Sequence, residues 1–321
     1  MTRILITGAA GMIGQALLAE LAGTGHEVVA TDVRPPPPPL PNGECAPDSH
    51  TLAFIRLDVR GGDPDRVIGE QRPETVVHLA SIVTPPENST REFEYSVDVE
   101  GTRNILDACI AHGVRRLVVT SSGAAYGYHR DNPVPLREDD RLRGNEEFAY
   151  AHHKRLVEEM LAEARRDAPQ LEQIVLRVGM VLGERLENQI TALFHRKRLL
   201  AVAGSKSPFV FIWTKDLARI LLRAATDGPP GIYNVAGDGS MDVDDLARAL
   251  RKPVLRLPAW ALQAALAAAR PLGLSRYGPE QVRFLQYRPV LDNTKLKTVF
   301  GYTPEKSSAE TFALWQKAAG L

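Results

Sequence analysis

Two side chains four residues apart are the first candidates for catalysis. Tyr150 and Lys154 lie in residues 148–160, a stretch with helical spacing, so both project from the same face of the expected helix. An ammonium group beside a phenol stabilises the phenolate. A phenol stabilised in this way exchanges a proton near neutral pH, and hydride transfer at an alcohol carbon needs such a proton partner.

A serine-rich segment supplies the third candidate. Thr120-Ser121-Ser122 ends an apolar run that is typical of a strand. A serine hydroxyl at this strand end can hydrogen-bond the substrate's hydroxyl or carbonyl oxygen and hold it near Tyr150. A Tyr and a Lys four apart are often an ordinary pair on a helix surface. The serines upstream favour the catalytic interpretation.

The N-terminal residues carry a glycine pattern between a strand and a helix. From Gly8 the chain runs Gly-Ala-Ala-Gly-Met-Ile-Gly. The glycines allow a sharp turn, a close approach of backbone N–H groups to a pyrophosphate and close packing of the helix, whose N-terminus faces the negative charge. The residues expected to bind a dinucleotide here are Gly8, Gly11, Met12, Ile13 and Gly14.

An acidic residue indicates which dinucleotide binds. Asp32 lies 18 residues beyond Gly14, at the end of the second expected strand. A carboxylate there accepts hydrogen bonds from both ribose hydroxyls and repels a 2′-phosphate, so the sequence predicts NAD in preference to NADP. Arg34 leaves NADP open, because a nearby cation tolerates that phosphate.

These residues need a scaffold, and the alternation of strands and helices over the first 180 residues predicts one. Short apolar runs are separated by segments with helical spacing, such as residues 13–22 and 97–112, which indicates a parallel sheet covered on both faces. The expected strands are residues 3–6, 27–30, 53–57, 75–79, 116–120 and 173–177. We expect an α/β fold, a Rossmann-type doubly wound parallel sheet with a smaller, discontinuous C-terminal substrate lobe.

The pattern becomes irregular after residue 180. An Ala- and Leu-rich helix over residues 257–272 is interpreted as core or subunit interface, and Asp242 as a helix cap. The other expected elements are helices at 189–200, 216–225 and 243–250 and strands at 210–213 and 231–235. The expected division is an NAD-binding domain of residues 1–178, to which 214–238 return, and a substrate lobe of 179–213 and 239–321.

Composition excludes several classes of protein. The chain has 321 residues, and its 39 Lys and Arg balance 39 Asp and Glu, which argues against a nucleic acid partner. Cys45 and Cys109 are too few for a disulfide scaffold or a Cys-based zinc site and fit a reducing cytosol. No cleavable signal fits before the first strand, and Gln263 and Arg270 interrupt the most apolar stretch. We expect a soluble cytoplasmic protein with no membrane partner.

Three features are interpreted as without a role in the chemistry. His152 and His153 are adjacent on a helix and face different ways, so no metal site is expected. Residues 195–198, His-Arg-Lys-Arg, are expected to form a solvated basic helix face, with phosphate binding as the alternative. The prolines at 35–39 and Pro41 predict a stiff loop, with recognition by a proline-binding partner as the alternative.

Over nearly its whole length the chain resembles the extended short-chain dehydrogenase/reductase, or NAD-dependent epimerase/dehydratase, family. The motifs that carry the resemblance are ILITGAAGMIG from Ile4, LDV from Leu57, VVHLAS from Val76, GTRNILDAC from Gly101, VVTSSGAAYG from Val118, Tyr150 with Lys154, LRVGMVLG from Leu176, KDLARIL from Lys215 and YNVAGDG from Tyr233. The resemblance implies that Asp58 and Val59 flank the adenine and that Leu79 and Ala80 lie along the phosphates and the nicotinamide ribose. It also implies a homodimer formed through the helices of residues 97–112 and 150–165.

For the chemistry, the resemblance implies that Ser122 is the catalytic hydroxyl and Tyr150 the acid/base, and that Lys154 binds the nicotinamide ribose while tuning Tyr150. Two positions depart from the family pattern in this region. Asp98 replaces the usual Asn, and His153 replaces the usual small residue before the Lys.

Other departures concern the substrate. Gly123 and Ala124 stand where the family's dehydratases have an Asp-Glu pair, so water elimination has no evident catalyst. Residues 208–213 are apolar where the epimerases carry an Arg that binds the diphosphate, and residues 178–181 lack an Asn that touches the nucleotide. Either Arg283 or Arg288 replaces that phosphate ligand, or both are plain surface charges.

The leading hypothesis is an NAD-dependent oxidoreductase acting on a secondary alcohol or carbonyl, and two substrate classes remain open. A sugar or sugar nucleotide would be epimerised by oxidation and re-reduction. A less polar and less anionic substrate is favoured by Phe209, Phe211 and Trp213 near the expected pocket and by the neutral net charge. The third hypothesis is a dinucleotide sensor without catalysis, although such relatives lack the Tyr or the Lys that this chain retains.

Overall fold

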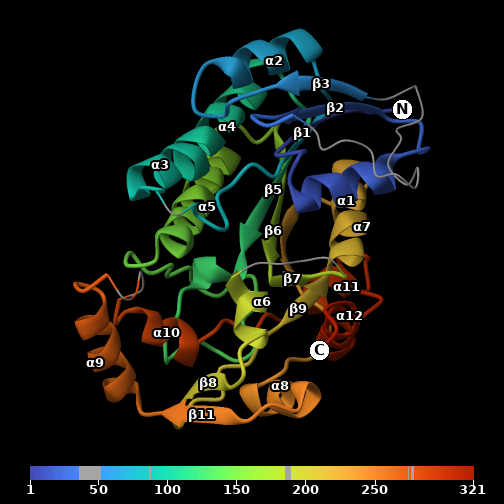
Figure 1. The fold of residues 1–321 in the computed structure, drawn as a ribbon. Helices are drawn as coiled ribbons and strands as arrows, with labels where there is room; N and C mark the ends of the chain where they lie inside the picture. Colours follow the sequence, from blue (N-terminus) through green and yellow to red (C-terminus); the bar gives the residue numbers. More distant parts are fainter. Residues whose placement is uncertain (36–51, 87, 185–188, 274, 276–277) are drawn as a thin grey trace.

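The computed structural model describes residues 1–35, 52–86, 88–184, 189–273, 275 and 278–321. Seven parallel strands form one sheet, in the order β10-β6-β5-β4-β1-β2-β3 (Figure 1). The strands are β1 (Arg3–Thr7), β2 (Glu27–Asp32), β3 (Leu52–Arg56), β4 (Thr75–His78), β5 (Arg116–Ser122), β6 (Glu172–Val178) and β10 (Gly231–Val235). Because β1 lies between β2 and β4, the crossovers diverge there, and such a switch point opens a crevice at the carboxyl ends of the strands.

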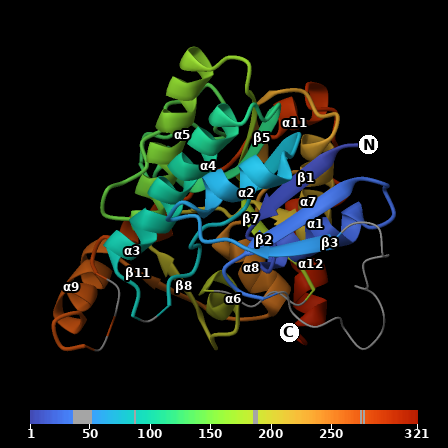
Figure 2. The ribbon, with the colours of Figure 1, turned by 90° about the horizontal axis from the view of Figure 1, so that it is seen from above.

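Helices cover both faces of this sheet, as its nearly continuous apolar strands predict (Figures 1 and 2). One face packs against α1 (Met12–Leu21) and α7 (Thr214–Ala225), and Leu296 and Phe300 from the end of the chain join that core. The other face packs against α2 (Asp63–Gln71), α4 (Gly101–Ala111) and α5 (Ala149–Asp167). The predicted doubly wound Rossmann-type sheet is confirmed.

The helix predicted over residues 97–112 begins further upstream. The chain turns into α3 (Arg91–Tyr95), passes through one π-helical turn (Ser96–Glu100) and continues as α4. This turn carries Asp98, which is buried. The π-helical turn therefore brings a carboxylate to the inner side of the helix, close to α5.

The C-terminal lobe is built from short elements around an aromatic core. Phe194, Phe209, Phe211, Phe312 and Trp315 form that core, with ring centres between 5.3 and 6.3 Å apart. Its elements are β7 (Met180–Leu182), α6 (Gln189–Phe194), β8 (Leu199–Val202), β9 (Phe211–Trp213), α8 (Val243–Leu250), β11 (Val254–Leu257), α9 (Ala259–Ala269), α10 (Gln281–Gln286) and α12 (Ser308–Ala318). The helix α11 (Thr294–Thr298) packs on the seven-stranded sheet instead. Asp242 caps α8 as predicted, accepting hydrogen bonds from the backbone N–H groups of Asp244 and Asp245.

One prediction for this lobe is wrong, and a second is wrong in one of its two alternatives. The helix expected over residues 189–200 ends at Phe194, and Leu199 begins β8 because it pairs with β11. Residues 195–198 are therefore an exposed bend rather than a helix face. The Ala- and Leu-rich helix is present as α9, and Leu262 is its buried residue, so it is not core, while the alternative of a subunit interface stays a prediction. A long-range strand pairing and an exposed apolar face leave no mark in local periodicity.

Some predictions fall outside the described residues, namely those on Cys45, Pro41 and most of the proline run at 35–39. Cys109 is a buried free thiol in α4, and burial raises its pKa well above the ordinary value. Within the described part of the chain, each helix is too short or too polar to cross a bilayer.

Candidate active site

The glycine loop brings the end of β1 against the end of β4. Gly8 has a φ of +70°, and a Cβ there would lie 2.7 Å from the backbone nitrogen of Ala80. A Cβ on Gly14 would lie 2.5 Å from the carbonyl oxygen of Gly8, so α1 packs directly on the loop. The loop is thus too closely packed for side chains at Gly8 and Gly14, as a dinucleotide cradle requires.

Helix α1 begins in this loop with an open N-terminus. Its N-cap, Gly11, makes no side-chain capping hydrogen bond. The first helical hydrogen bond runs from the N–H of Gln15 to the carbonyl of Gly11, so the N–H groups of Met12, Ile13 and Gly14 have no acceptor one helical turn earlier. Such a helix end accepts an anion.

Asp32 ends β2 beside the same loop, as the sequence predicts. Its carboxylate accepts hydrogen bonds from the N–H of Ala10 at 3.1 Å and from the N–H of Arg34 at 3.0 Å. The Arg34 side chain approaches it at 3.4 Å and is two-thirds exposed. The carboxylate is therefore anchored at the loop, while the guanidinium lies at the surface.

Behind Leu79 and Ala80 lies a buried hydrogen-bond chain that sequence reasoning missed. The Thr7 hydroxyl accepts from both of their N–H groups at 3.2 and 3.3 Å and lies 2.8 Å from His78 Nδ1. His78 Nε2 lies 3.0 Å from the hydroxyl of Thr102, which donates to a backbone carbonyl, so Nε2 carries the proton. Burial and the nearby charge of Lys154 lower the pKa of His78 to about 3. A neutral histidine thus holds the loop that follows β4.

The predicted catalytic residues come from β5 and α5. Lys154 is buried, donates from Nζ to the carbonyl oxygen of Thr120 at 2.9 Å and lies 5.5 Å from the centre of the Tyr150 ring. Ser122 lies two residues beyond Thr120, on the same face of β5, and its Oγ accepts from the N–H of Ala124 at 3.1 Å. The lysine therefore ties the helix that carries Tyr150 to the strand that ends in Ser122.

A second buried contact fixes α5 one turn further on. Glu158 accepts a hydrogen bond from Ser121 at 2.5 Å and pairs with Arg177 of β6 at 2.7 Å. Arg177 also donates to the hydroxyl of Tyr126 at 2.7 Å. Burial raises the pKa of Tyr126 to about 12, so this phenol stays protonated. The network sets the register between α5 and the serine-rich end of β5.

The two departures from the family pattern are in contact. Asp98 lies 3.2 Å from His153 Nδ1, and its other oxygen accepts from the Ser81 hydroxyl at 2.8 Å and the Ile82 N–H at 2.9 Å. Burial alone would raise the pKa of Asp98, but the hydrogen bond from His153 and the charge of Lys154 hold it below its ordinary value. Asp98 thus joins the loop after β4 to the residue beside Lys154.

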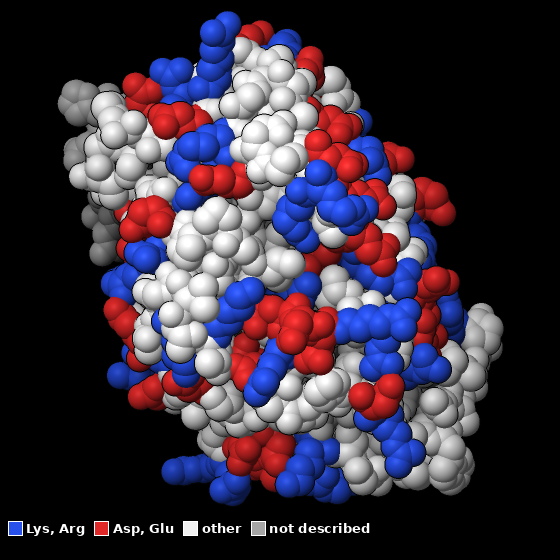
Figure 3. Space-filling model, turned by 180° about the vertical axis from the view of Figure 1, so that it is seen from behind, with Lys and Arg blue, Asp and Glu red and all other residues white. Residues whose placement is uncertain are grey.

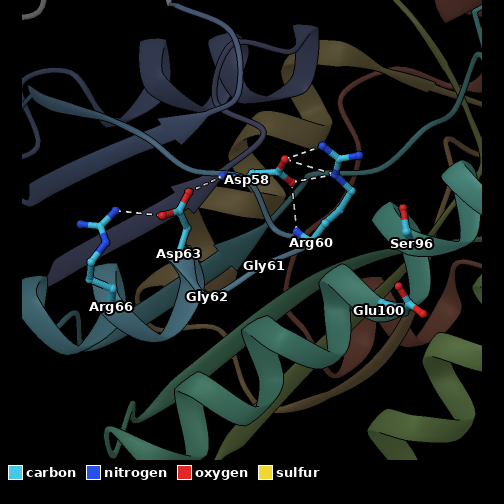
Figure 4. Close-up of a pocket in the computed structure, with 8 residues that line it drawn as sticks. All are labelled: Asp58, Arg60, Gly61, Gly62, Asp63, Arg66, Ser96 and Glu100. Atoms are coloured by element: carbon cyan, nitrogen blue, oxygen red, sulfur yellow. Dashed lines mark hydrogen bonds and ion pairs between the residues drawn. The ribbon is translucent and has the colours of Figure 1, made fainter.

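Asp58, expected near the adenine, lines a pocket of about 710 Å³ with Arg60, Gly61, Gly62, Asp63, Arg66, Ser96 and Glu100 (Figure 4). Figure 4 shows Arg60 folded back on Asp58, which it meets at 2.6 Å, and this pair lowers the pKa of Asp58. Val59 is buried, and a Cβ on Gly101 would lie 2.5 Å from its side chain. The pocket lies along the β3–α2 loop, and Tyr150 does not line it.

Of the two arginines considered as phosphate ligands, one is paired and one is not. Arg283 forms an exposed ion pair with Glu147 at 2.9 Å. Arg288 is buried between the rings of Phe209 and Phe284, whose centres lie 3.9 and 4.8 Å from its guanidinium carbon. It donates to Ser207, its Nε has no hydrogen-bond acceptor among the described residues, and burial lowers its pKa to about 9. Arg288 is thus a buried cation without a carboxylate partner in the described structure.

Aromatic rings connect Arg288 with Tyr150. Phe284 lies 5.3 Å from Tyr128, and Tyr128 packs in one cluster with Phe148 and Tyr150. Sequence reasoning missed Tyr128, because a tyrosine after the Tyr-Gly pair of a strand-end loop has no distinctive spacing. This cluster joins the expected catalytic residue to the buried cation.

The remaining predicted substrate residues lie in different places. Gly123 packs against Leu291, and a Cβ there would be 3.2 Å from that side chain. Trp213 lies with Lys306 and Lys215, whose ammonium groups are 4.8 and 5.9 Å from its ring. No group of three His, Cys, Asp or Glu side chains suited to a metal ion is present in the described residues.

Comparison with known proteins agrees with this fold. The model of the NAD-dependent epimerase/dehydratase family matches residues 4–236, and the chain belongs to that family. The family consists of NAD-dependent enzymes of the extended short-chain dehydrogenase/reductase class, as the sequence resemblance implied.

Individual relatives cover almost the whole chain. A UDP-glucose 4-epimerase from Mycolicibacterium smegmatis is 28% identical, with 97% of this chain and 96% of that protein aligned. An uncharacterised protein of Mycobacterium tuberculosis is 25% identical, over 99% of this chain and 84% of its own length.

Solved structures share the fold. MoeE5 in complex with UDP-glucuronic acid and NAD has a TM-score of 0.74 at 24% identity, covering 99% of both chains. The UDP-Glc/GlcNAc 4-epimerase of Campylobacter jejuni has a TM-score of 0.75 at 17% identity, covering 100% of both.

Proposed function

We propose that the protein is an NAD-dependent oxidoreductase that acts at a secondary alcohol or carbonyl with Ser122, Tyr150 and Lys154 as its catalytic residues. The observation that carries the proposal is the bond from Lys154 to the Thr120 carbonyl, which holds the lysine beside Tyr150 and against the strand that ends in Ser122. When bound, NAD supplies the hydride acceptor. The residues proposed to hold it are Gly8, Gly11, Met12, Ile13, Gly14, Asp32, Asp58, Val59, Leu79, Ala80, Tyr150 and Lys154.

The chemistry of each side chain determines the role we assign to it in the reaction. Oxidation of a secondary alcohol removes a hydride from carbon and a proton from oxygen. The Tyr150 phenolate takes the proton, and Lys154 stabilises that phenolate through its positive charge. Ser122 hydrogen-bonds the same substrate oxygen and so keeps it within reach of Tyr150. In the reducing direction Tyr150 returns the proton to the carbonyl oxygen.

The substrate proposed for this site carries an anionic group. Arg288 is a buried cation without a partner carboxylate among the described residues, and burial of an unpaired charge is costly. A phosphate or carboxylate of the substrate would pair with this charge and offset the cost of burying it. This argues against the less anionic substrate favoured by the neutral net charge of the chain.

Epimerisation of a sugar nucleotide is the second candidate. Arg288 favours it, because a diphosphate is one anion that a buried guanidinium binds strongly. The similarity to a UDP-glucose 4-epimerase over nearly the full chain supports it too. The homodimer through α4 and α5 and the cytoplasmic location stay predictions.

A substrate panel distinguishes the two candidates. The protein is incubated with NAD and either simple secondary alcohols or UDP-sugars, and both NADH absorbance and substrate stereochemistry are followed. A net oxidoreductase accumulates NADH, whereas an epimerase converts the sugar without net NADH. Tyr150→Phe should lower turnover by about 1,000-fold with NAD affinity nearly unchanged, and Tyr302→Phe serves as the control. Turnover that survives Tyr150→Phe would refute the catalytic assignment.

A further inference from the structure

Helix α9 is an apolar helix that the rest of the lobe leaves largely uncovered. Its 11 residues contain no charged side chain, and Leu262 is the buried one. Trp260 is 72% exposed and Leu272, just beyond the helix, is 71% exposed. Both ribbon views place α9 at the edge of the molecule, away from the seven-stranded sheet (Figures 1 and 2). Such a surface marks a site of interaction.

The exposed apolar surface continues onto the adjoining two-stranded sheet. In this sheet β8 and β11 pair in parallel, and Leu200 and Leu255 are register partners. Both side chains are exposed, at 39% and 41%. The strands β8 and β11 lie along the lower edge of the lobe in Figure 1, and β11 leads into α9.

The same segments carry positive charge only. Residues 195–206 and 251–273 contain eight Lys and Arg and no Asp or Glu, in a chain whose net charge is zero. The Arg-Lys-Arg run at residues 196–198 is exposed and forms no ion pair with the described residues. Arg256 is the one of the eight that does so, with Asp244 of α8. The rear view mixes both signs over most of the surface, and the lower right, where α9 lies in that view, is largely white (Figure 3).

We propose that α9, with the exposed leucine pair and the basic run at 196–198, docks onto an anionic lipid surface. Tryptophan at the edge of an apolar helix suits the boundary between headgroups and acyl chains. The run at 196–198 precedes β8 at the other end of the same two-stranded sheet, and its unpaired cations are attracted to anionic headgroups. This proposal concerns attachment to one face of a membrane, and it revises the expectation of no membrane partner drawn from the lack of a spanning segment.

Charge and apolar surface together favour an anionic membrane over a second copy of the chain or a nucleic acid. A second copy of the chain docking here would bring two basic runs together, and like charges repel. A nucleic acid would meet the cations, but it would leave the uncharged face of α9 uncovered. An anionic membrane matches both the positive charge and the apolar face.

Vesicle binding tests the proposal. The full chain is mixed with phosphatidylcholine vesicles that contain or lack phosphatidylglycerol, and bound protein is separated by flotation. We expect binding to the anionic vesicles, a blue shift of tryptophan fluorescence on binding, and release at high salt. Of the three tryptophans, Trp260 is the strongly exposed one, so the shift reports on α9.

Two variants, each with a matched control, locate the surface. Trp260→Ser should abolish the fluorescence shift and weaken binding, unlike Val299→Ser, which changes an exposed residue at the end of α11. The triple variant Arg196→Gln, Lys197→Gln, Arg198→Gln should weaken binding about 100-fold, unlike Arg72→Gln, Arg166→Gln, Lys317→Gln, which removes the same charge elsewhere. Failure to bind anionic vesicles overturns the proposal, as does a dimer of the wild type that Trp260→Ser dissociates.

Discussion

The carboxylate of Asp98 and the imidazole of His153 meet at 3.2 Å, although 55 residues separate them in the chain. Both side chains are 1% exposed, and the ring of Tyr95 packs edge-on against His153 at 5.6 Å. Each residue departs from the family pattern: Asp in place of Asn adds a buried negative charge, and His in place of a small residue adds a buried imidazole. The two substitutions therefore form one compensated pair next to Lys154.

The pair predicts strong coupling between two substitutions that restore the usual residue types. Asp98→Asn or His153→Ser alone should lower the free energy of unfolding by about 3 kcal/mol, because each leaves one buried polar partner behind. The double variant should be less destabilised than the sum by at least about 1.5 kcal/mol. Urea unfolding of the four proteins measures this, and simple additivity would show that the contact contributes nothing.

A structural feature of this protein can be predicted from the sequence when its signal lies in a short stretch of the chain. The glycine loop, Asp32 at the end of β2 and the pairing of Tyr150 with Lys154 on α5 follow from spacing alone, and the structure has them there. The strands of the main sheet were anticipated to within a few residues, because buried parallel strands are continuously apolar.

Contacts between segments that are distant in the chain could not be predicted from the sequence. Nothing local distinguishes Arg288 from Arg283, since one is buried by rings from two other segments and the other is held at the surface by Glu147. The strand β8 forms because β11 pairs with it, and a helix was expected there. Periodicity reports which face is apolar, and tertiary packing decides whether that face is covered.

Asp32 should determine the preference for NAD over NADP. Asp32→Asn removes the negative charge and keeps one of the two oxygens, so either the N–H of Ala10, bonded to Oδ2, or the N–H of Arg34, bonded to Oδ1, loses its acceptor. We expect NAD to bind about tenfold more weakly, because hydrogen bonds to a charged acceptor are the stronger ones, and NADP to bind more tightly. Calorimetric titration with both dinucleotides measures this. Adding Arg34→Gln should cancel the gain for NADP, and a gain that persists would exclude Arg34 as the phosphate ligand.

Arg288 should help to bind the substrate, and its unpaired buried charge should make the folded protein less stable. Arg288→Met replaces a buried cation by an apolar side chain of similar length, so the free energy of unfolding should stay equal or rise by about 1 kcal/mol. The KM for an anionic substrate should rise at least about tenfold with a smaller change in kcat. Arg283→Met is the control, since that guanidinium is exposed and paired. A destabilised variant with unchanged KM would instead give Arg288 a purely structural role through Ser207.

His78 should make the protein sensitive to acid. The unfolded chain binds a proton at this histidine near its ordinary pKa of 6.5, whereas the folded protein binds it at about pH 3. Between these values the unfolded state holds more protons, so stability is complete above pH 6.5 and falls as the pH drops, by up to about 5 kcal/mol. His78→Gln should lose some stability at neutral pH through Thr7 and Thr102 and should show a shallower fall in acid. His195→Gln, at an exposed histidine, is the control. Urea midpoints measured from pH 7 downward test this, and an unchanged slope in His78→Gln would mean that other groups cause the acid sensitivity.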